Sequence, residues 1–251
     1  MASKLTLIDT SIHGPRLGEL HFLSGSVTQR NINHIVDYTG FFRDESGNTK
    51  YTSVENFDAE AWFESDSSNA GTLTTNYLAY NGATVQPRLQ ISRSFAGPPN
   101  QSFFVVRYTL TNSATETITF NILDMVHLNN LDASKNVHAW YDAGNCALIA
   151  DMTASGQFFL FLGALDPVDG HQTANDSDTS TSSATVSGWC SFNANGTLMN
   201  NNDVQTSNVD LAFNKRLTVD PGQSQSVHFY IGICETQADA NAAIAAARAS
   251  A

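Results

Sequence analysis

Two parts of this chain concentrate residue types that can move protons or bond hydroxyl groups. The first part, residues 33–64, offers His34, Asp37, Tyr38, Arg43, Glu60, Trp62 and Glu64. If residues 59–64 form a strand, Glu60, Trp62 and Glu64 share one face, so that two carboxylates flank an indole ring. Such carboxylates can act as general acid and base when burial raises one pKa. The alternative is a rim of exposed charges around an interfacial tryptophan.

The second part supplies Asp124, His127, Trp140 and Tyr141. His127 continues the polar face of its predicted strand, whereas Asp124 falls on the apolar face. A buried, unpaired carboxylate is costly, so Asp124 must find a partner or stay protonated. The alternatives are a satisfied core aspartate, a strand-end histidine and core positions for the two aromatic residues.

Other kinds of site have weaker support. The aspartates of residues 166–178 could offer oxygen ligands to calcium, but they lack a recognised spacing. Neither a Gly-x-Ser-x-Gly elbow nor a phosphate-binding glycine loop is present. Cys146, Cys190 and Cys234 are odd in number and far apart, which indicates buried free thiols. We therefore expect neither a metal site nor a cofactor.

The elements that must position these residues are mainly β-strands. The chain has 251 residues, with 41% hydrophobic and only 14% charged residues, which suits a single all-β domain. The predicted strands lie within residues 5–23, 59–64, 72–80, 84–95, 103–112, 117–126, 137–141, 147–151, 157–165, 184–192, 204–219 and 225–234. We expect Pro87 at an edge or a bulge, since it cannot donate to a ladder. Residues 166–183 have no periodicity and are predicted to be the longest loop.

Residues 103–112 and 117–126 show the clearest alternation. Val106, Tyr108 and Leu110 share one face, and the opposite face is polar enough to be partly wet. The connection between the segments is short and polar, so we predict an antiparallel hairpin within a β-meander. In the C-terminal tail, Thr236 and Asp239 predict a capping box that opens an alanine-rich helix.

Three segments carry a family resemblance: Tyr108-Thr-Leu-Thr-Asn112 with the strand after it, the Pro221-Gly-Gln-Ser entry to the last strand, and the alanine-rich tail. Together they resemble the β-supersandwich domain that precedes the catalytic barrel in bacterial glucoamylase-type and glucodextranase-type glycoside hydrolases. The resemblance implies an antiparallel, galactose mutarotase-like supersandwich over residues 1–235. It also implies a helix over residues 236–251 that packs on the sandwich or extends from it. The catalytic carboxylates of that family lie on the barrel, so no catalytic residue is carried over.

The charge and hydropathy of the chain disfavour two classes of partner. Acidic residues outnumber basic ones 24 to 12, giving a formal charge of −12, and the basic residues are scattered. We therefore expect no nucleic-acid partner, because phosphate binding needs clustered Lys and Arg. No stretch approaches a membrane span, and the N-terminus lacks the apolar segment of a secretory signal. We expect no membrane partner and a cytoplasmic protein, or a secreted one if a signal peptide has been removed.

Our leading hypothesis is a protein that binds an oligo- or polysaccharide through aromatic, carboxylate and histidine side chains. The catalytic candidates are Glu60, Glu64, Asp124 and His127, and the ligand-binding candidates are His34, Asp37, Tyr38, Arg43, Trp62, Trp140 and Tyr141. The alternative is a stand-alone glycoside hydrolase, lyase or isomerase that uses a carboxylate or histidine as acid and base. A homo-oligomer or a separately encoded catalytic subunit is a further possible partner.

Overall fold

A computed structural model of the chain describes residues 5–9, 17–22, 35–44, 62–64, 70–81, 84–98, 101–175 and 197–250. The side chains that it describes are those of Tyr38, Gly40 and residues 90–98, 101–173 and 197–250.

The described residues form antiparallel strands, one short 3-10 helix and one α-helix. The strands are β1 (Leu5–Asp9), β2 (Leu17–Phe22), β3 (Ile35–Asp44), β4 (Trp62–Glu64), β5 (Ala70–Asn81), β6 (Thr84–Ala96), β7 (Phe103–Asn112), β8 (Ile118–Leu128), β9 (Val137–Asp142), β10 (Ala147–Asp151), β11 (Phe159–Ala164), β12 (Gly170–Asn175), β13 (Asp203–Thr206), β14 (Val209–Val219) and β15 (Ser224–Cys234). The helices are η1 (Thr153–Ser155) and α3 (Gln237–Ala249). The predicted all-β class with a C-terminal helix is confirmed.

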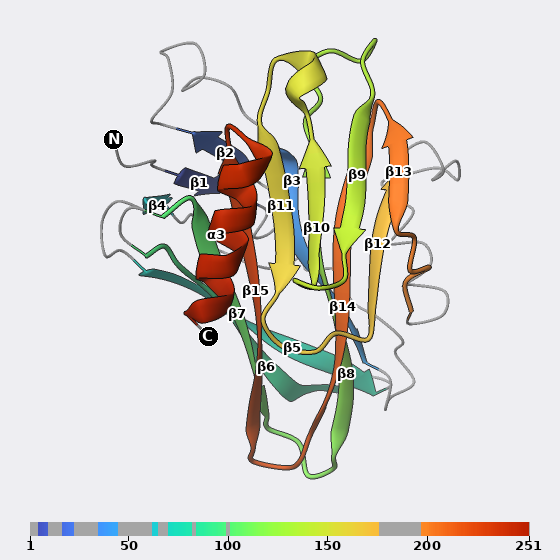
Figure 1. Cartoon of the computed structure of the whole chain (residues 1–251). Coiled ribbons are helices and arrows are strands. Elements are labelled where there is room, and N and C mark those ends of the chain that lie inside the picture. The colour runs from blue at the N-terminus through green and yellow to red at the C-terminus, as the bar shows by residue number, and fades with distance from the viewer. Residues whose placement is uncertain are drawn as a thin grey trace.

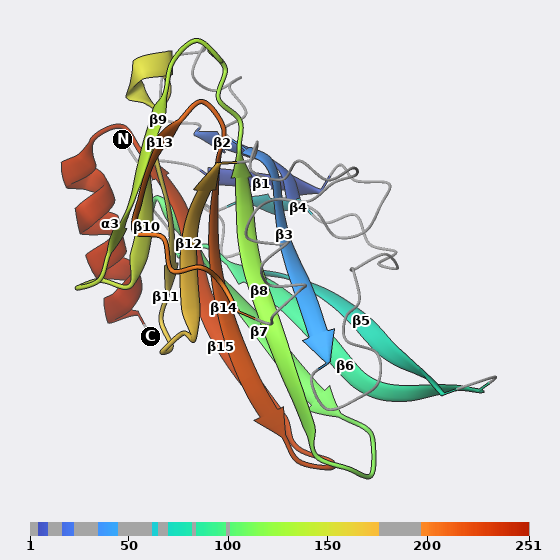
Figure 2. The same ribbon diagram turned by 90° about the vertical axis from the view of Figure 1, so that its right-hand side faces the viewer.

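The strands form two sheets that pack face to face (Figures 1 and 2). A seven-stranded sheet has the order β12-β14-β8-β3-β2-β1-β4, and an eight-stranded sheet has the order β13-β9-β10-β11-β15-β7-β6-β5. Helix α3 lies on the outer side of the eight-stranded sheet, away from the other layer (Figure 2). The molecule therefore has one interior between the sheets and two outer sheet faces.

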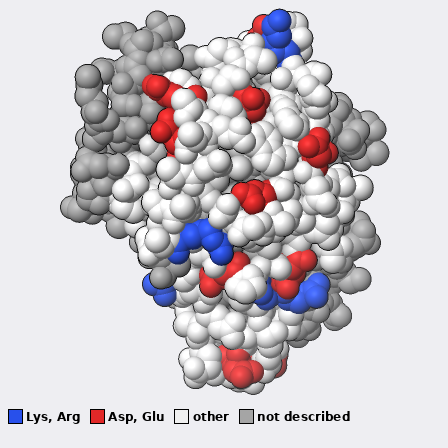
Figure 3. All heavy atoms as spheres, viewed as in Figure 1, with Lys and Arg blue, Asp and Glu red and all other residues white. Residues whose placement is uncertain are grey.

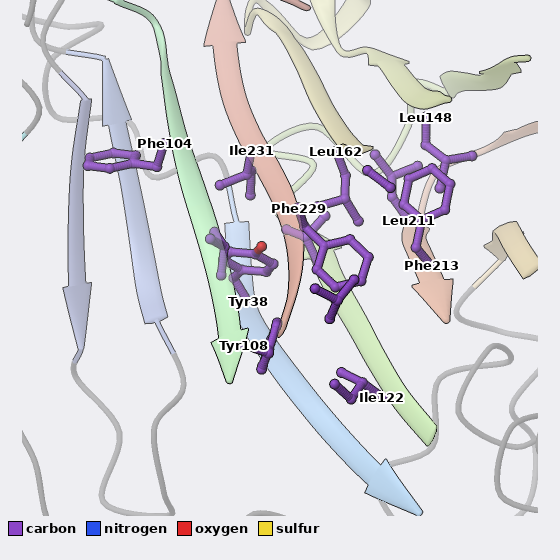
Figure 4. Close-up of a cluster of buried hydrophobic side chains, with 14 of the residues drawn as sticks. Tyr38, Phe104, Tyr108, Ile122, Leu148, Leu162, Leu211, Phe213, Phe229 and Ile231 are labelled. Carbon is purple, nitrogen blue, oxygen red and sulfur yellow. The ribbon is translucent and has the colours of Figure 1, made fainter. Parts of the chain in front are cut away.

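The interior is built by the alternation expected from the sequence. On β7, Val106, Tyr108 and Leu110 are fully buried and face the other sheet, whereas Arg107 is exposed and Thr109 half-buried on the outer side. The predicted faces of this strand are confirmed. Figure 4 shows Tyr38 and Tyr108 among the apolar side chains that fill the space between the sheets.

The predicted hairpin between β7 and β8 is wrong. β7 belongs to the eight-stranded sheet, where it pairs with β6 and β15, and β8 belongs to the seven-stranded sheet, where it pairs with β3 and β14. The short connection therefore crosses between layers. Two strands that each bury one apolar face look alike in sequence whether they pair side by side or face each other across a core, so alternation could not separate the two arrangements.

A second crossing, from β14 to β15, runs beside the first, and Asn112 joins them. The buried Asn112 amide donates to the Glu116 and Val219 carbonyl oxygens, both at 2.8 Å, and its Oδ1 accepts from the Ala114 backbone N–H. The backbone of Asn112 also exchanges hydrogen bonds with Gly222 and Gln223 in the second crossing. One side chain thus holds both inter-sheet connections at the same end of the sandwich.

The outer face of β8 is open only near its two ends, where Thr119 and His127 are half-buried. Leu123 and Met125 are buried against Leu198 and Ala212 on the outer side of the seven-stranded sheet. The segment that contains Leu198 is far from β8 in the sequence, so no local pattern could show that it covers this face. β11 is apolar on both sides as predicted, because the sandwich core covers one side and α3 the other.

Four local predictions have different outcomes. The predicted loop of residues 166–183 contains β12, which pairs with β14, and the predicted strand of residues 204–219 is divided into β13 and β14, which lie in different sheets. The pairing of β5 and β6 shifts register beside Pro87, which confirms an irregularity there. The predicted strand of residues 184–192 lies outside the described residues.

Helix α3 begins and packs as its sequence predicts. The Thr236 side chain caps the helix by accepting from the Asp239 backbone N–H at 3.1 Å. Ala240, Ile244 and Ala247 are buried against the eight-stranded sheet. Within the part of the chain that the structure describes, no helix is long and apolar enough to cross a membrane.

The Asn112 tie makes a testable contribution to stability. Asn112→Ala should lower the free energy of unfolding by about 2 to 4 kcal/mol, because it leaves buried backbone groups without partners. Chemical denaturation measures the loss. Thr115→Ala, an exposed change in the same connection, is the control and should shift stability by less than about 0.5 kcal/mol. Equal losses in the two variants would contradict this role of Asn112.

Candidate functional site

The structure brings most of the predicted site residues into one sheet. Asp37, Tyr38 and Arg43 lie on β3, Trp62 and Glu64 on β4, and Asp124 and His127 on β8, all in the seven-stranded sheet. Trp140 and Tyr141 lie on β9 in the eight-stranded sheet, and His34 and Glu60 lie outside the described residues.

These residues do not form a single cluster. β4 is four strands from β8, a separation of about 19 Å at the usual strand spacing. Tyr38 and Asp124 face the interior, whereas His127 faces outward. The sheet therefore divides the candidates into a buried group around Asp124 and an outer group around His127.

Asp124 is the centre of a buried charge network made with Tyr38, Arg93 and Tyr108. The Tyr38 hydroxyl donates to Asp124 Oδ2 at 2.7 Å, and the Tyr108 hydroxyl donates to Oδ1 at 2.5 Å. The Arg93 guanidinium donates to Oδ1 at 3.3 Å and to the Tyr38 carbonyl oxygen at 3.2 Å. None of the four side chains is more than 2% exposed.

The network joins the two sheets, since Tyr38 and Asp124 belong to one and Arg93 and Tyr108 to the other. The Arg93 guanidinium carbon lies 4.3 Å from the centre of the Tyr38 ring and 5.3 Å from that of Tyr108, in reach of cation–π attraction. Gly40 makes room for this arrangement, because a Cβ there would meet the Tyr108 hydroxyl at 2.6 Å.

Burial raises the pKa of the acid and of the two tyrosines that donate to it. Desolvation raises the pKa of the Asp124 carboxyl above its ordinary value, although Arg93 and the two tyrosine hydroxyls act in the opposite direction. Desolvation also raises the pKa of both tyrosines, so they remain hydrogen-bond donors. A carboxylate that is fully enclosed and bonded in this way favours the interpretation of Asp124 as a satisfied core residue.

The sequence contained a signal for Arg93, the partner of Asp124, although this residue was not predicted. Arg93 alternates with Ile91 and Phe95, both buried, so its side chain had to enter the interior as well. A cation on one apolar strand face and an acid on another can satisfy each other, but their pairing depended on how the sheets stack.

The outer group centres on an ion pair between His127 and Asp210. His127 Nδ1 lies 2.6 Å from Asp210 Oδ1, and the exposed fractions of the two side chains are 16% and 1%. A carboxylate only accepts, so in this pair Nδ1 carries the donated proton and the orientation of the ring is fixed. The two residues are register partners on β8 and β14. Asp210 was not predicted, although it is an acid within the apolar run of β14.

The backbone register places a second acid beside this pair. Asp37 on β3 is the register partner of His127, so Asp37, His127 and Asp210 occupy one row across three neighbouring strands. Further along the same face, the buried Asn214 amide donates to Asn121 Oδ1 at 3.1 Å, and Gln172 Oε1 accepts from the Met199 backbone N–H. The face is therefore rich in amide, imidazole and carboxylate groups.

The two aromatic candidates, Trp140 and Tyr141, are half-buried and lie on the other sheet, outside this row. Trp140 packs against the cluster under α3, and its ring lies 5.1 Å from the ring of His138. Tyr141 stacks on His171 with ring centres 3.6 Å apart, and burial raises the pKa of Tyr141 to about 12. Both positions fit the core alternative as well as a contact role.

No metal centre is formed by the side chains that the structure describes, since no three His, Cys, Asp or Glu residues gather there. Asp166 instead pairs with His228, and Asp169 accepts from the Arg216 backbone N–H. Asp176 and Asp178 lie outside the described residues.

The sequence matches no protein-family model and no curated protein. The structure, in contrast, is similar to solved structures. A galactose mutarotase-like protein from Lactobacillus casei has a TM-score of 0.51 at 9% identity, covering 93% of this chain and 97% of that one. The chain has a galactose mutarotase-like fold.

Two larger proteins contain a similar region. A polysaccharide lyase has a TM-score of 0.54 at 13% identity, covering 97% of this chain, and a bacterial glucoamylase solved with acarbose has a TM-score of 0.53 at 7% identity, covering 92%. This chain spans only 34% of the lyase and 31% of the glucoamylase. At such identities the likeness establishes the fold.

The buried charge network predicts a large stability effect. Asp124→Ala should lower the free energy of unfolding by about 3 to 5 kcal/mol, because it leaves the Arg93 guanidinium buried without its counter-charge. Thermal and denaturant unfolding test this. Asp203→Ala provides the control, since Asp203 is 66% exposed and pairs with the exposed His138, and its cost should be about 0 to 1 kcal/mol. A mild effect at Asp124 would show that the network is not a stabilising contact.

Proposed function

We propose that this protein binds an oligo- or polysaccharide on the outer face of the seven-stranded sheet, around His127. The observation that carries the proposal is the His127–Asp210 pair, in which a nearly fully buried carboxylate orients a partly exposed imidazole. An oriented polar group of this kind, on a rigid strand, is typical of sites that recognise ligands by hydrogen bonds.

The chemistry of the face fits a neutral, hydroxyl-rich ligand. A carboxylate accepts from hydroxyls and an imidazole can donate to or accept from them, and the row of Asp37, His127 and Asp210 has these residue types on adjacent strands. The formal charge of −12 disfavours polyanions but leaves a neutral saccharide unaffected. Of the residue types that the sequence predicts for a saccharide site, histidine and carboxylate lie together here, while Trp62 and Glu64 lie toward the other edge of the sheet.

The structural relatives support the same ligand class at the level of the fold. One is a polysaccharide lyase and another a glucoamylase bound to acarbose. Shared fold does not transfer activity, so the saccharide remains our proposal. The chain spans about a third of each of these two proteins.

A second candidate function is catalysis at the same place. The His127–Asp210 pair is also the arrangement that holds an imidazole for general acid or base work, with the aspartate fixing its tautomer. A hydrolase, lyase or isomerase acting on a saccharide would then use His127 as the proton-transfer group. Turnover would produce new anomeric proton NMR signals that grow with time, whereas binding alone would not.

One experiment separates the two functions. The protein is titrated with gluco-, fructo-, manno- and galacto-oligosaccharides, and binding is followed by calorimetry and anomeric proton NMR. For a binding protein, His127→Ala should weaken affinity about tenfold or more, because a hydrogen bond to an ionisable group is lost. For an enzyme, the same variant should lower turnover about 100-fold or more.

His138→Ala is the matched control. His138 also pairs with an aspartate, Asp203, but it is 47% exposed and lies on the eight-stranded sheet. It should leave affinity and turnover unchanged. The proposal fails if no saccharide binds or reacts, or if the two histidine variants behave alike.

A further inference from the structure

The outer face of the seven-stranded sheet holds two buried amides that are only partly paired. Gln172 on β12 and Asn214 on β14 are each 1% exposed. Gln172 Oε1 accepts from the Met199 backbone N–H at 3.1 Å, and Asn214 Nδ2 donates to Asn121 Oδ1 at 3.1 Å. The other polar atom of each amide, Gln172 Nε2 and Asn214 Oδ1, is buried and has no hydrogen-bond partner among the described residues.

Two unpaired atoms of this kind are costly. A buried donor or acceptor without a partner loses its hydration and gains no bond in exchange. The charged side chains seen on the face that carries α3 avoid this cost, because they lie at the surface, where water solvates them (Figure 3). Turning the Gln172 amide round would not help, because the Met199 N–H would then face a second donor. The two atoms therefore need a partner that the described side chains do not supply.

The strand register places the two amides at diagonal corners of a small square on the sheet. Gln172 is the register partner of Ala212, and Gly170 is the register partner of Asn214. Residues two apart on a strand share a face, so all four positions face outward. Diagonal neighbours of this kind lie about 7 to 8 Å apart. Two hydrogen bonds of about 2.8 Å each span up to about 5.6 Å, so one small group between the amides can bond to both.

The other two corners of the square carry the two smallest residues. Ala212 has one side-chain carbon and Gly170 has none, so neither fills the centre of the square with a long side chain. Gly170 also makes room for the neighbouring amide, because a Cβ there would meet Asn214 Oδ1 at 2.5 Å. The same Cβ would lie 3.2 Å from Asn200 Oδ1, which belongs to the segment above the sheet.

Residues 197–202, which we call the covering segment, close the square from outside. Leu198 packs on Ala212, and the His171 backbone N–H donates to Asn200 Oδ1 at 3.0 Å. Asn200 has a φ of 57°, a left-handed conformation that asparagine adopts more readily than most residues. Apolar packing and hydrogen bonds thus hold the covering segment against the sheet, and they keep the two amides out of bulk solvent.

The chemistry of the two atoms selects one kind of partner. Gln172 Nε2 is a donor, which disfavours a cation, and Asn214 Oδ1 is an acceptor, which disfavours an anion. A hydroxyl group both accepts and donates, so a single hydroxyl can bond to both atoms at once. Water carries such a group, and so does any ligand with an alcohol.

We propose that Gln172 and Asn214 form a buried binding site for one hydroxyl group beneath the covering segment. In the free protein, water supplies this group, since buried waters bond to polar groups that the chain leaves unpaired. A ligand hydroxyl, of the kind that a saccharide carries, is the second source. The inference does not depend on the proposed function at His127, because water alone can fill the site.

A crystal structure of the full chain and water–protein NMR test the site. We expect a density peak about 2.7 to 3.2 Å from both Gln172 Nε2 and Asn214 Oδ1. We also expect nuclear Overhauser and rotating-frame cross-peaks of opposite sign between water and the Gln172 side-chain amide protons, which a long-lived bound water produces. The Asn112 amide is the matched control. It is equally buried but donates to two carbonyl oxygens, so it should show no such cross-peak.

One variant removes the acceptor side of the site. Asn214→Leu should abolish the water cross-peak at Gln172, because the bridging group loses one of its two bonds. Asn201→Ala, which changes an exposed side chain of the covering segment, should leave the cross-peak unchanged. Circular dichroism verifies that both variants are folded. The crystal structure and the NMR of the unmodified chain decide the matter if Asn214→Leu does not fold.

Adding the oligosaccharides named for the proposed function separates the two sources of the hydroxyl. Loss of the water cross-peak in a complex, with a sugar oxygen at the density peak, would show that the ligand supplies the group. A cross-peak that persists in the complex would show that water alone supplies it. Both results support the site. If no saccharide binds while the water signals are present, the proposed function fails and this inference stands.

Three outcomes would overturn the inference. The first is the absence of both the density peak and the water cross-peak, with or without a saccharide. The second is an ion at the position between the two amides. The third is a crystal structure in which Gln172 Nε2 donates directly to Asn214 Oδ1, because the two atoms would then satisfy each other. An equal cross-peak at Asn112 would also contradict it, since the signal would not report unpaired atoms.

Discussion

The buried contact between Asp124 and Arg93 is the constraint on which the two-layer arrangement depends. Each side chain comes from a different sheet, and neither can be left unpaired in the interior without a large cost. Tyr38 and Tyr108 complete the carboxylate's hydrogen bonds, and Gly40 leaves space for the Tyr108 ring. The sheets can therefore stack in few ways, because a shift of one layer would separate the charges.

At one end of the sandwich, Asn112 also fixes how the two sheets lie relative to each other, through hydrogen bonds to backbone groups. It ties the β7–β8 crossing to the β14–β15 crossing, so four strands from two sheets meet at one buried amide. The charge network and this tie act together: one fixes how the layers face each other, and the other fixes where the chain passes between them.

The two outer sheet faces differ in the side chains that they carry. The seven-stranded sheet carries the oriented His127–Asp210 pair beside an apolar patch that Leu198 covers. The eight-stranded sheet carries α3 on one part and cross-strand pairs of threonine and serine hydroxyls on another. Galactose mutarotase-like folds thus offer two chemically distinct sheet surfaces here, and fold likeness alone does not decide which one a ligand uses.

The sequence by itself determined the local features of this protein. Alternation on β7 and the two-sided apolar run of β11 can be seen in the order of residues along one strand, and the Thr236 cap of α3 is a contact within one helical turn, so all three could be predicted. Tertiary structure alone decided that β7 and β8 lie in different sheets, that Arg93 reaches Asp124 and that Asp210 orients His127. Those pairings join residues 31 or more positions apart, or depend on which sheet a strand enters. Periodicity reports which face of a strand is buried, but not what it is buried against, because every apolar face gains similar free energy from any apolar partner.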